Sequence, residues 1–374
     1  MRVLHVHSGN LYGGVEAILV TLARYQDLYP QMESHFALCF EGRLSEELLA
    51  AGAPVYRLGK TRLRQLRSVM RGRRILKDLV AQGSFDLGIC HSGWSQAIFG
   101  PVFRSAALPL VVWFHNPTNG RNWLDRWGSL TEPELALCNS KFTAKAVSDQ
   151  YPHVRAEVVY CPVANQPTSS AENRRVKRAE LQTPEDATVI IQVSRMEAWK
   201  GQSLHLEALS QIKELPDWIC WQVGGTQRPQ EVQYREHLEQ LSRRLGIAER
   251  VRFLDQRSDV QSLLRAADIY CQPNAGAEPF GIAFVEALYA GLPVVTTAIG
   301  GATEIVDDSC GVLAPCADPV ALASSLRRLI QDPVLRHRLG DAGPERARKL
   351  CDPQTQMKRL NEVLASVKYR EAKA

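Results

Sequence analysis

Short apolar runs rich in β-branched residues alternate with longer segments of helical spacing through the first half of the chain. This alternation is typical of βαβ units, in which helices cover a parallel sheet. It therefore predicts an α/β fold. The runs that we interpret as strands are residues 3–6, 35–40, 54–58, 87–91, 110–114, 135–139 and 158–161.

A second series of the same kind follows a polar segment, residues 162–172, which contains two Pro residues and has no apolar periodicity. We interpret this segment as a linker between two domains, residues 1–165 and residues 166–353. Two similar halves joined in this way imply a cleft between them. The last segment, about residues 354–374, carries apolar residues at helical spacing. The strand candidates of the second series are residues 189–193, 218–224, 251–254, 269–272, 293–297 and 311–313.

Composition places the chain among ordinary globular proteins, since 45% of its 374 residues are hydrophobic and 23% are charged. The formal net charge of +5 is too small to indicate a nucleic-acid-binding protein. The nine Cys residues include no C-x-x-C pair, so we expect buried thiols in a reducing compartment. We see neither a signal peptide nor an apolar run of the ~18 residues that a membrane span needs. We therefore expect a cytoplasmic protein, either free or peripheral at the inner face of the membrane.

Two carboxylates eight positions apart bracket the most informative stretch, Glu278-Pro-Phe-Gly-Ile-Ala-Phe-Val-Glu286. We expect a helix to begin near Gly281, which would leave backbone N–H groups free to bind a diphosphate or sugar oxygen. Glu278 would then lie in the preceding loop and Glu286 about one and a half turns into the helix. The two carboxylates can therefore touch different parts of one ligand. The alternative is an ordinary strand-loop-helix connection with Glu286 facing solvent.

Two cations follow the first strand candidate of the second half, in Ser194-Arg-Met-Glu-Ala-Trp-Lys-Gly201. Arg195 and Lys200 would lie at the carboxyl edge of a parallel sheet, where open α/β sheets bind ligands. A planar guanidinium and a mobile ammonium together suit a diphosphate that gains negative charge as a bond breaks. The alternative is an exposed loop with ordinary surface cations.

The first half offers two weaker signals. Gly13-Gly14 lies between the first strand candidate and an apolar-periodic helix, where paired glycines let the backbone approach a ligand or simply make a tight turn. His115 ends another strand candidate, which fits either a catalytic residue or a structural hydrogen-bonding one.

Taken together, these motifs resemble the family-4 retaining glycosyltransferases, also called glycosyltransferase group 1. The most specific part begins at Ala266-Ala267-Asp268-Ile269 and runs through Glu278-Pro-Phe-Gly and Glu286-Ala-Leu-Tyr-Ala-Gly291-Leu-Pro293 to Gly300-Gly301-Ala-Thr-Glu304. The family has the GT-B fold, with two Rossmann-like domains facing across a cleft. The resemblance also implies that the C-terminal helix crosses back to the first domain.

The resemblance implies a metal-independent hexosyltransferase that moves a sugar from a UDP- or GDP-sugar to a hydroxyl acceptor, with no cofactor. Glu286 would hold the ribose hydroxyls, Glu278 the donor sugar, and Arg195 and Lys200 the diphosphate. His115 would face the sugar. We therefore expect catalytic roles for His115, Glu278, Arg195 and Lys200. The implied donor-binding set is Gly13, Gly14, Arg195, Lys200, Glu278, Phe280, Gly281, Ile282, Ala283 and Glu286.

The chain departs from the family pattern at two places. Gly224-Gly225-Thr-Gln follows a strand candidate where the family usually has an acidic residue between two glycines, and His115-Asn116 stands where many members have His-Asp. The sequence also has no Asp-x-Asp motif that would suggest a metal site. An epimerase of the same fold and a catalytically silent binding subunit are the alternatives to a transferase.

Residues 60–77 contain eight cations and no acidic residue. Leu63, Leu66, Met70 and Leu76 lie near one face at helical spacing, so we interpret the stretch as an amphipathic basic helix. Two interpretations stand. Either an anionic membrane surface or anionic acceptor binds it, or it is a solvated helix face whose charge is balanced elsewhere.

Overall fold

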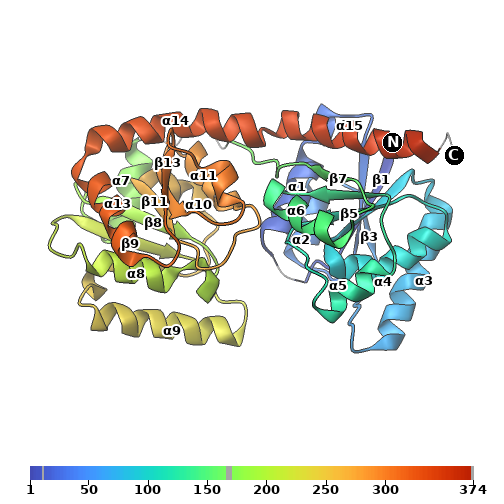
Figure 1. Cartoon of the computed structure of the whole chain (residues 1–374), viewed down its shortest axis with the longest axis horizontal. Coiled ribbons are helices and arrows are strands. Elements are labelled where there is room, and N and C mark those ends of the chain that lie inside the picture. Colours follow the sequence, from blue (N-terminus) through green and yellow to red (C-terminus); the bar gives the residue numbers. More distant parts are fainter. Residues whose placement is uncertain (11, 166–170, 372–374) are drawn as a thin grey trace. The chain divides into compact units, whose positions relative to one another are not determined.

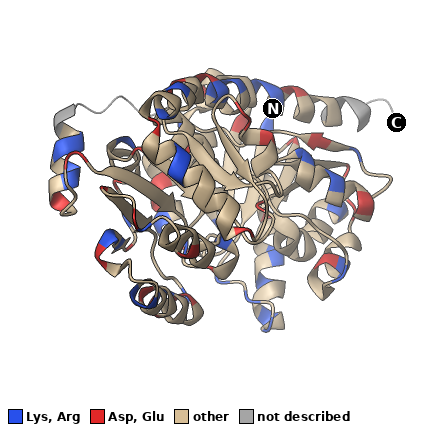
Figure 2. Ribbon diagram, turned by 60° about the vertical axis from the view of Figure 1, so that its left-hand side comes forward, with Lys and Arg blue, Asp and Glu red and all other residues tan. Residues whose placement is uncertain are grey.

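The computed structural model describes residues 1–10, 12–165 and 171–371. The chain forms two compact units, one of Met1–Ala164 with Cys351–Ala374 and one of Asn165–Leu350 (Figure 1). Basic and acidic residues are interspersed on both units (Figure 2), in keeping with the small net charge. Residues 166–170 of the expected linker lie outside the described residues.

The first unit contains a seven-stranded parallel sheet with the strand order β3-β2-β1-β4-β5-β6-β7. The order reverses between β1 and β4, and such a reversal opens a ligand site at the carboxyl ends of the two strands. The strands are β1 Arg2–His7, β2 Glu33–Leu38, β3 Val55–Arg57, β4 Leu87–His91, β5 Leu110–Phe114, β6 Leu135–Cys138 and β7 Ala156–Val158. The α-helices are α1 Gly14–Arg24, α2 Arg43–Ala50, α3 Leu66–Gly83, α4 Ser92–Ser105, α5 Trp123–Ser129, α6 Lys141–Gln150 and α15 Pro353–Glu371.

The second unit repeats this design with a six-stranded parallel sheet in the order β10-β9-β8-β11-β12-β13. Here the reversal lies between β8 and β11. The strands are β8 Thr188–Val193, β9 Trp218–Val223, β10 Val251–Leu254, β11 Ile269–Gln272, β12 Val294–Thr297 and β13 Gly311–Ala314. The helices are α7 Ala171–Glu180, η2 Ala198–Lys200, α8 Gln202–Ser210, α9 Pro229–Arg244, η3 Ala248–Arg250, α10 Val260–Ala266, α11 Ile282–Tyr289, α12 Ala302–Ile305, α13 Pro319–Gln331 and α14 Pro333–Cys351.

Burial explains why the strands appear as unbroken apolar runs. Every residue of β4 and β5 is buried, because helices cover both faces of a parallel sheet. The prediction of an α/β fold with two Rossmann-like domains is confirmed.

One strand prediction was wrong in its position. The last strand of the first sheet is Ala156–Val158 rather than residues 158–161. Val159 and Cys161 are nevertheless buried, and the N–H of Val159 donates to the carbonyl of Cys138 on β6 at 2.9 Å. The apolar run therefore marked a buried segment that leaves the sheet, since periodicity reports burial more directly than strand pairing.

The basic stretch is helical only in part, because α3 begins at Leu66. The residues expected on its apolar face differ in burial. Leu76 is buried, together with Val69 and Gly72, whereas Leu66 and Met70 are 73% and 59% exposed. In the described part of the chain, no helix is long and apolar enough to cross a membrane.

The C-terminal helix α15 packs on the first unit, as the resemblance implies. Met357, Leu360, Val363 and Leu364 are all buried. Arg359 also pairs with Glu157 at 2.6 Å. The apolar stripe and this ion pair hold the end of the chain against the residues around β7.

Leu360→Ala should therefore lower the free energy of unfolding by about 2–5 kcal/mol, because it removes a buried side chain and leaves a cavity. Urea unfolding of the variant and of the unchanged chain measures this loss. The matched control is Glu362→Ala, an exposed position on the same helix that should have little effect. Equal unfolding midpoints for both variants would contradict the packing of α15.

Candidate functional site

An ion pair joins the loops that follow the two strands at the switch point of the second unit. Lys200 belongs to the short helix after β8, and Glu278 to the loop after β11. The Nζ atom of Lys200 donates to Oε2 of Glu278 at 2.6 Å. The side chains are only 14% and 9% exposed. Two residues 78 positions apart are therefore held together at the carboxyl edge of the sheet.

Amide groups complete the surroundings of Glu278. Its Oε2 atom also accepts from Nε2 of Gln272 at 3.3 Å and from Nδ2 of Asn274 at 3.5 Å. Because these two amides and Lys200 all donate to the same oxygen atom, they fix the orientation of the Glu278 side chain.

Two glycines allow the loops to approach this closely. At Gly201, with φ +74°, a Cβ atom would lie 1.8 Å from the carbonyl oxygen of Pro273. At Gly300, with φ +66°, a Cβ atom would lie 2.4 Å from the carbonyl oxygen of Glu278. Any side chain at either position would push the loop that carries Lys200 or Glu278 away.

The helix after Glu278 begins where the sequence predicts. Gly281 is the N-cap residue, with φ +106°, and α11 runs over Ile282–Tyr289. Phe280 is packed in the core, whereas Gly281, Ile282 and Ala283 are only partly buried. The first N–H groups of a helix have no intrahelical acceptor, so those of Ile282 and Ala283 lie at the positively polarised end of α11.

Glu286 lies on α11, apart from the ion pair. It is partly buried, and burial raises the pKa of its carboxyl group to about 7, against the opposing effect of a hydrogen bond with Gln261. A ligand that donates hydroxyl groups to Glu286 would favour the ionised form and offset this cost.

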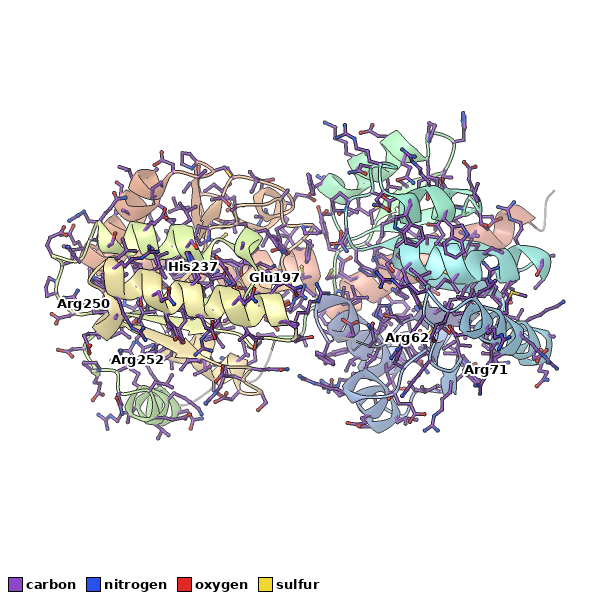
Figure 3. All side chains as sticks on the ribbon, turned by 90° about the horizontal axis from the view of Figure 1, so that it is seen from below. Arg62, Arg71, Glu197, His237, Arg250 and Arg252 are labelled. Atoms are coloured by element: carbon purple, nitrogen blue, oxygen red, sulfur yellow. The ribbon has the colours of Figure 1, made fainter. Side chains whose placement is uncertain are left out.

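Arg195 is held by two other carboxylates. Its Nη2 atom lies 3.0 Å from Oε2 of Glu197, and its Nη1 atom lies 3.9 Å from Oε1 of Glu231. Figure 3 labels Glu197 on the second unit. Glu231 is buried and caps α9 by accepting from the backbone N–H of Arg228 at 3.2 Å. Within the described residues, Arg195 makes no ion pair with Glu278, so the structure leaves the two predicted cations on separate carboxylates.

Buried polar side chains that sequence reasoning missed fix the loop between Arg195 and Lys200. Gln192 donates to the carbonyl of Lys200 at 2.9 Å, and Gln202 donates to the carbonyl of Arg195 at 2.9 Å. His205 in turn contacts Gln192 at 2.9 Å. The sequence did contain a signal for this role: Gln192 lies in the otherwise apolar strand β8, and Gln202 begins helix α8. A buried amide needs hydrogen-bond partners, which here are the backbone carbonyls of the loop.

In the first unit, Gly13 is the N-cap residue of α1 and Gly14 is its first residue. The N–H of Gly13 donates to Oε2 of Glu16 at 2.9 Å, while Oε1 of Glu16 lies 2.7 Å from Nε2 of His7. Burial alone would raise the pKa of Glu16, but hydrogen bonds from His7 and backbone N–H groups lower it below its usual value. Glu16 therefore fixes both the glycine turn and the orientation of His7.

His115 follows β5 and is also buried. Its Nε2 atom lies 2.9 Å from Nδ1 of His91, and its carbonyl accepts from Nδ2 of Asn139 at 3.1 Å. Burial, with a smaller effect of a charge on His7, lowers the pKa of His115 to about 3, so the ring is neutral. The neighbouring histidines were missed, although alternate positions in the run His5-Val-His7 already indicated two of them on one sheet face.

The structure thus gathers the predicted residues into two groups. Lys200, Glu278, Arg195, residues 280–283 and Glu286 surround the carboxyl edge of the second sheet, and Gly13, Gly14 and His115 lie at that of the first. Among the described side chains, no three His, Cys, Asp or Glu residues are arranged to hold a metal ion.

Two family models together match most of the chain. Residues 12–166 match the model described as Glycosyltransferase Family 4, and residues 173–346 match the one described as Glycosyl transferases group 1.

Individual proteins are similar over nearly the full length. A lipopolysaccharide core biosynthesis glycosyltransferase, LpsD, of Rhizobium meliloti is 28% identical, covering 93% of both chains. A phosphatidyl-myo-inositol mannosyltransferase of Mycobacterium leprae is 29% identical, covering 92% of this chain and 90% of its own. The crystal structure of HepE from Anabaena in complex with UDP and glucose superposes with a TM-score of 0.86 at 24% identity, covering 98% of this chain and 100% of HepE.

The raised pKa of Glu286 predicts a stability difference that depends on pH. A carboxyl group ionises near 4.5 when exposed in the unfolded chain and near 7 here, so its contribution to stability is present below pH 4.5 and is lost as the pH rises to 7. Glu286→Gln removes the charge. Relative to the unchanged chain, the variant should gain about 2 kcal/mol between pH 5 and pH 7.5.

Thermal or urea unfolding at the two pH values, without ligand, measures this difference. The control is Glu304→Gln on α12, for which no such gain is expected. A pH-independent difference for Glu286→Gln would show that the carboxyl group is not desolvated.

Proposed function

Since the chain belongs to the family-4 glycosyltransferases of the GT-B fold, we propose that it moves a sugar from a nucleotide-diphosphate sugar to a hydroxyl acceptor with retention of configuration. The observation that carries this proposal is the Lys200–Glu278 ion pair at the switch point of the second sheet, 2.6 Å long and largely buried. It presents an ammonium group and a fixed carboxylate side by side, which suits a ligand with phosphate and hydroxyl groups.

In this proposal each residue meets the part of the donor that its chemistry suits. Arg195 and Lys200 hold the diphosphate, which competes with their present carboxylate partners. Glu278 and the N–H groups of Ile282 and Ala283 bind the sugar, and Glu286 accepts from two ribose hydroxyls. In the first unit, Gly14 allows close approach of the α1 turn to substrate, and His115 hydrogen-bonds a substrate oxygen.

The chemistry follows from charge. As the bond from the sugar to the diphosphate breaks, negative charge grows on the leaving phosphate, and Arg195 and Lys200 stabilise it. The leaving phosphate accepts the proton of the attacking hydroxyl on the same face of the sugar, which gives retention without a protein nucleophile. We propose that the two cations take the part that a divalent metal plays in other transferases, and that the donor is a UDP- or GDP-sugar. The similarity to HepE, which was crystallised with UDP and glucose, supports a UDP-sugar as the donor.

Replacing Lys200 or Arg195 with Ala should lower turnover by ~10²-fold or more, because each cation acts on charge that develops in the transition state. Release of nucleoside diphosphate from UDP- and GDP-sugars measures turnover, and proton NMR of the product's anomeric centre tests retention. Because Lys200→Ala also leaves Glu278 buried without its cation, the double variant Lys200→Met, Glu278→Gln separates lost folding from lost catalysis.

The control is Arg327→Ala, which removes a half-exposed cation paired with Glu214 on the same unit. Full turnover in both Lys200→Ala and Arg195→Ala would remove the two cations from the mechanism. Interconversion of nucleotide sugars without an acceptor would identify an epimerase instead.

We further propose that the acceptor is lipid-linked and that α3 holds the enzyme at an anionic membrane surface. The exposed Leu66 and Met70 lie among exposed cations that form no ion pair within the described residues. Figure 3 labels two of the cations around this face, Arg62 and Arg71. Arg73 is different: it donates to the carbonyls of Ala97 and Ile98 and fastens α3 to α4. The names of the two curated relatives, with lipopolysaccharide and phosphatidyl-myo-inositol, support the proposal.

Co-sedimentation with vesicles tests this attachment. Each cation near an anionic surface contributes ~1 kcal/mol, so Arg67→Gln with Arg71→Gln should weaken binding about 30-fold. Binding should also fall with salt and be absent for neutral phosphatidylcholine vesicles. The matched control is Arg243→Gln with Arg244→Gln, two exposed cations of α9. No binding to anionic vesicles, with full activity on a water-soluble acceptor, would overturn the membrane proposal and leave the transferase assignment untouched.

A further inference from the structure

Three buried imidazoles are joined in a line across the first sheet, and we call His5, His91 and His115 the histidine row. Nδ1 of His5 lies 2.9 Å from Nε2 of His91, and Nδ1 of His91 lies 2.9 Å from Nε2 of His115. The neighbouring rings are tilted by only 27° and 12°, with 5.2 Å between ring centres in each case. The short nitrogen distances at these separations mean that the rings meet through their edges, as hydrogen-bonded imidazoles do.

Strand register explains this line. β1, β4 and β5 are neighbours, and their parallel pairing places His5 opposite Ile89 and His91 opposite Trp113. His91 therefore lies two residues after Ile89, the partner of His5, and His115 lies two residues after Trp113, the partner of His91. Since side chains alternate with a period of two, all three point to the same face of the sheet.

Each ring carries a single proton. Burial lowers the pKa of His5 and of His115 to about 3, and lowers that of His91 well below its usual value. The two hydrogen bonds can then run in either of two directions. If His5 donates to His91 and His91 donates to His115, the proton of His115 is on Nδ1. If the direction is reversed, the proton of His5 is on Nε2.

The two ends of the row differ in their position in the sheet. Nε2 of His5 and Nδ1 of His115 are both fully buried and have no hydrogen-bond partner in the described part of the chain, so either direction leaves one N–H group that needs an acceptor. His5 lies within β1, whereas His115 follows β5 at the carboxyl edge of the sheet, where a water or substrate oxygen can accept from it. The row therefore favours the direction that leaves a lone pair on His5 and gives His115 a proton on Nδ1.

We propose that His5 and His91 are positioning residues that hold His115 in its Nδ1–H form, so that His115 donates a hydrogen bond to an oxygen of the sugar substrate. The proposal rests on the proposed function, because it takes the ligand to be a sugar. The aligned N–H groups polarise one another, so the last one is a stronger donor than an isolated imidazole.

His7 lies beside the row. Its Nε2 atom is bound to Glu16, and its Nδ1 atom is buried and has no partner in the described part of the chain. Its ring centre lies 6.1 Å from that of His91. The end of the first sheet therefore offers two unpartnered ring nitrogens, Nδ1 of His115 and Nδ1 of His7, for hydrogen bonds with a sugar.

Nitrogen-15 NMR of the full chain with labelled histidine tests the direction of the row without any measurement of activity. His5, His91 and His115 should each carry the proton on Nδ1, whereas His7, as the internal reference, should have a proton on Nε2, the atom that contacts Glu16. Single His→Gln variants assign the resonances. A proton on Nε2 of His115 in the unchanged chain would overturn the proposal.

Replacing the central histidine tests the link to substrate. In His91→Leu, Nε2 of His115 should shift toward the resonance of a lone pair that accepts no hydrogen bond, and kcat/KM should fall about tenfold, the scale seen when a histidine loses its orienting partner. His91→Gln offers one acceptor and one donor, so it should retain kcat/KM to within about threefold.

The matched control is His35→Leu, which removes a buried histidine of β2 that lies outside the row and should leave kcat/KM unchanged. Melting temperatures of all variants separate unfolding from lost positioning, and His5→Leu replaces His91→Leu if the latter does not fold. Unchanged kcat/KM in a folded His91→Leu, or equal losses in His91→Leu and His91→Gln, would overturn the proposal. If no nucleotide sugar supports turnover, the proposed function fails, while the NMR measurement still decides the direction of the row.

Discussion

The buried ion pair between Lys200 and Glu278 is the interaction on which the second unit's site depends. Two charged groups taken out of water are tolerated only when they satisfy each other and their other hydrogen-bonding capacity is met. Gln272 and Asn274 meet it for Glu278, and Gln192 holds the backbone at Lys200. The glycines at positions 201 and 300 follow from the same constraint, because only an absent side chain lets the loops come this close. The result is an edge of the sheet at which a cation and an anion are held side by side.

The first unit uses a different arrangement of buried polar groups. Instead of an ion pair, its central strands carry neutral histidines that satisfy one another, together with the His7–Glu16 pair beside the glycine turn of α1. Neutral rings avoid most of the cost of burying charge, and a hydrogen-bonded row still has a direction. The row therefore fixes the orientation of each ring within an otherwise apolar sheet.

The family and its fold could be predicted from the sequence because their signals are local. Apolar runs separated by helical spacing specify βαβ units, and Gly281 marks the start of α11 by its backbone conformation alone. The placement of Lys200 and Glu278 at one edge also followed, since each comes directly after a strand of a parallel sheet. The orientation of a helix relative to the core could not be predicted in the same way. The sequence placed Leu66, Met70 and Leu76 near one apolar face of α3, whereas in the structure Leu76 is buried with Val69 and Gly72, and Leu66 and Met70 are exposed.

The sequence by itself determined the two α/β units, the order of their elements, and the residue types that surround each sheet edge. Apolar periodicity and the positions of Gly and Pro are local features, so they do not depend on contacts with distant parts of the chain. Tertiary structure decided which side chains meet. The pairing of Arg195 with Glu231 depends on where α9 begins, and the histidine row exists only because β1, β4 and β5 are adjacent with one register. Strand order and register are set by the packing of the whole sheet, so contacts across strands, and the proton positions that they fix, cannot be obtained from positions along the chain.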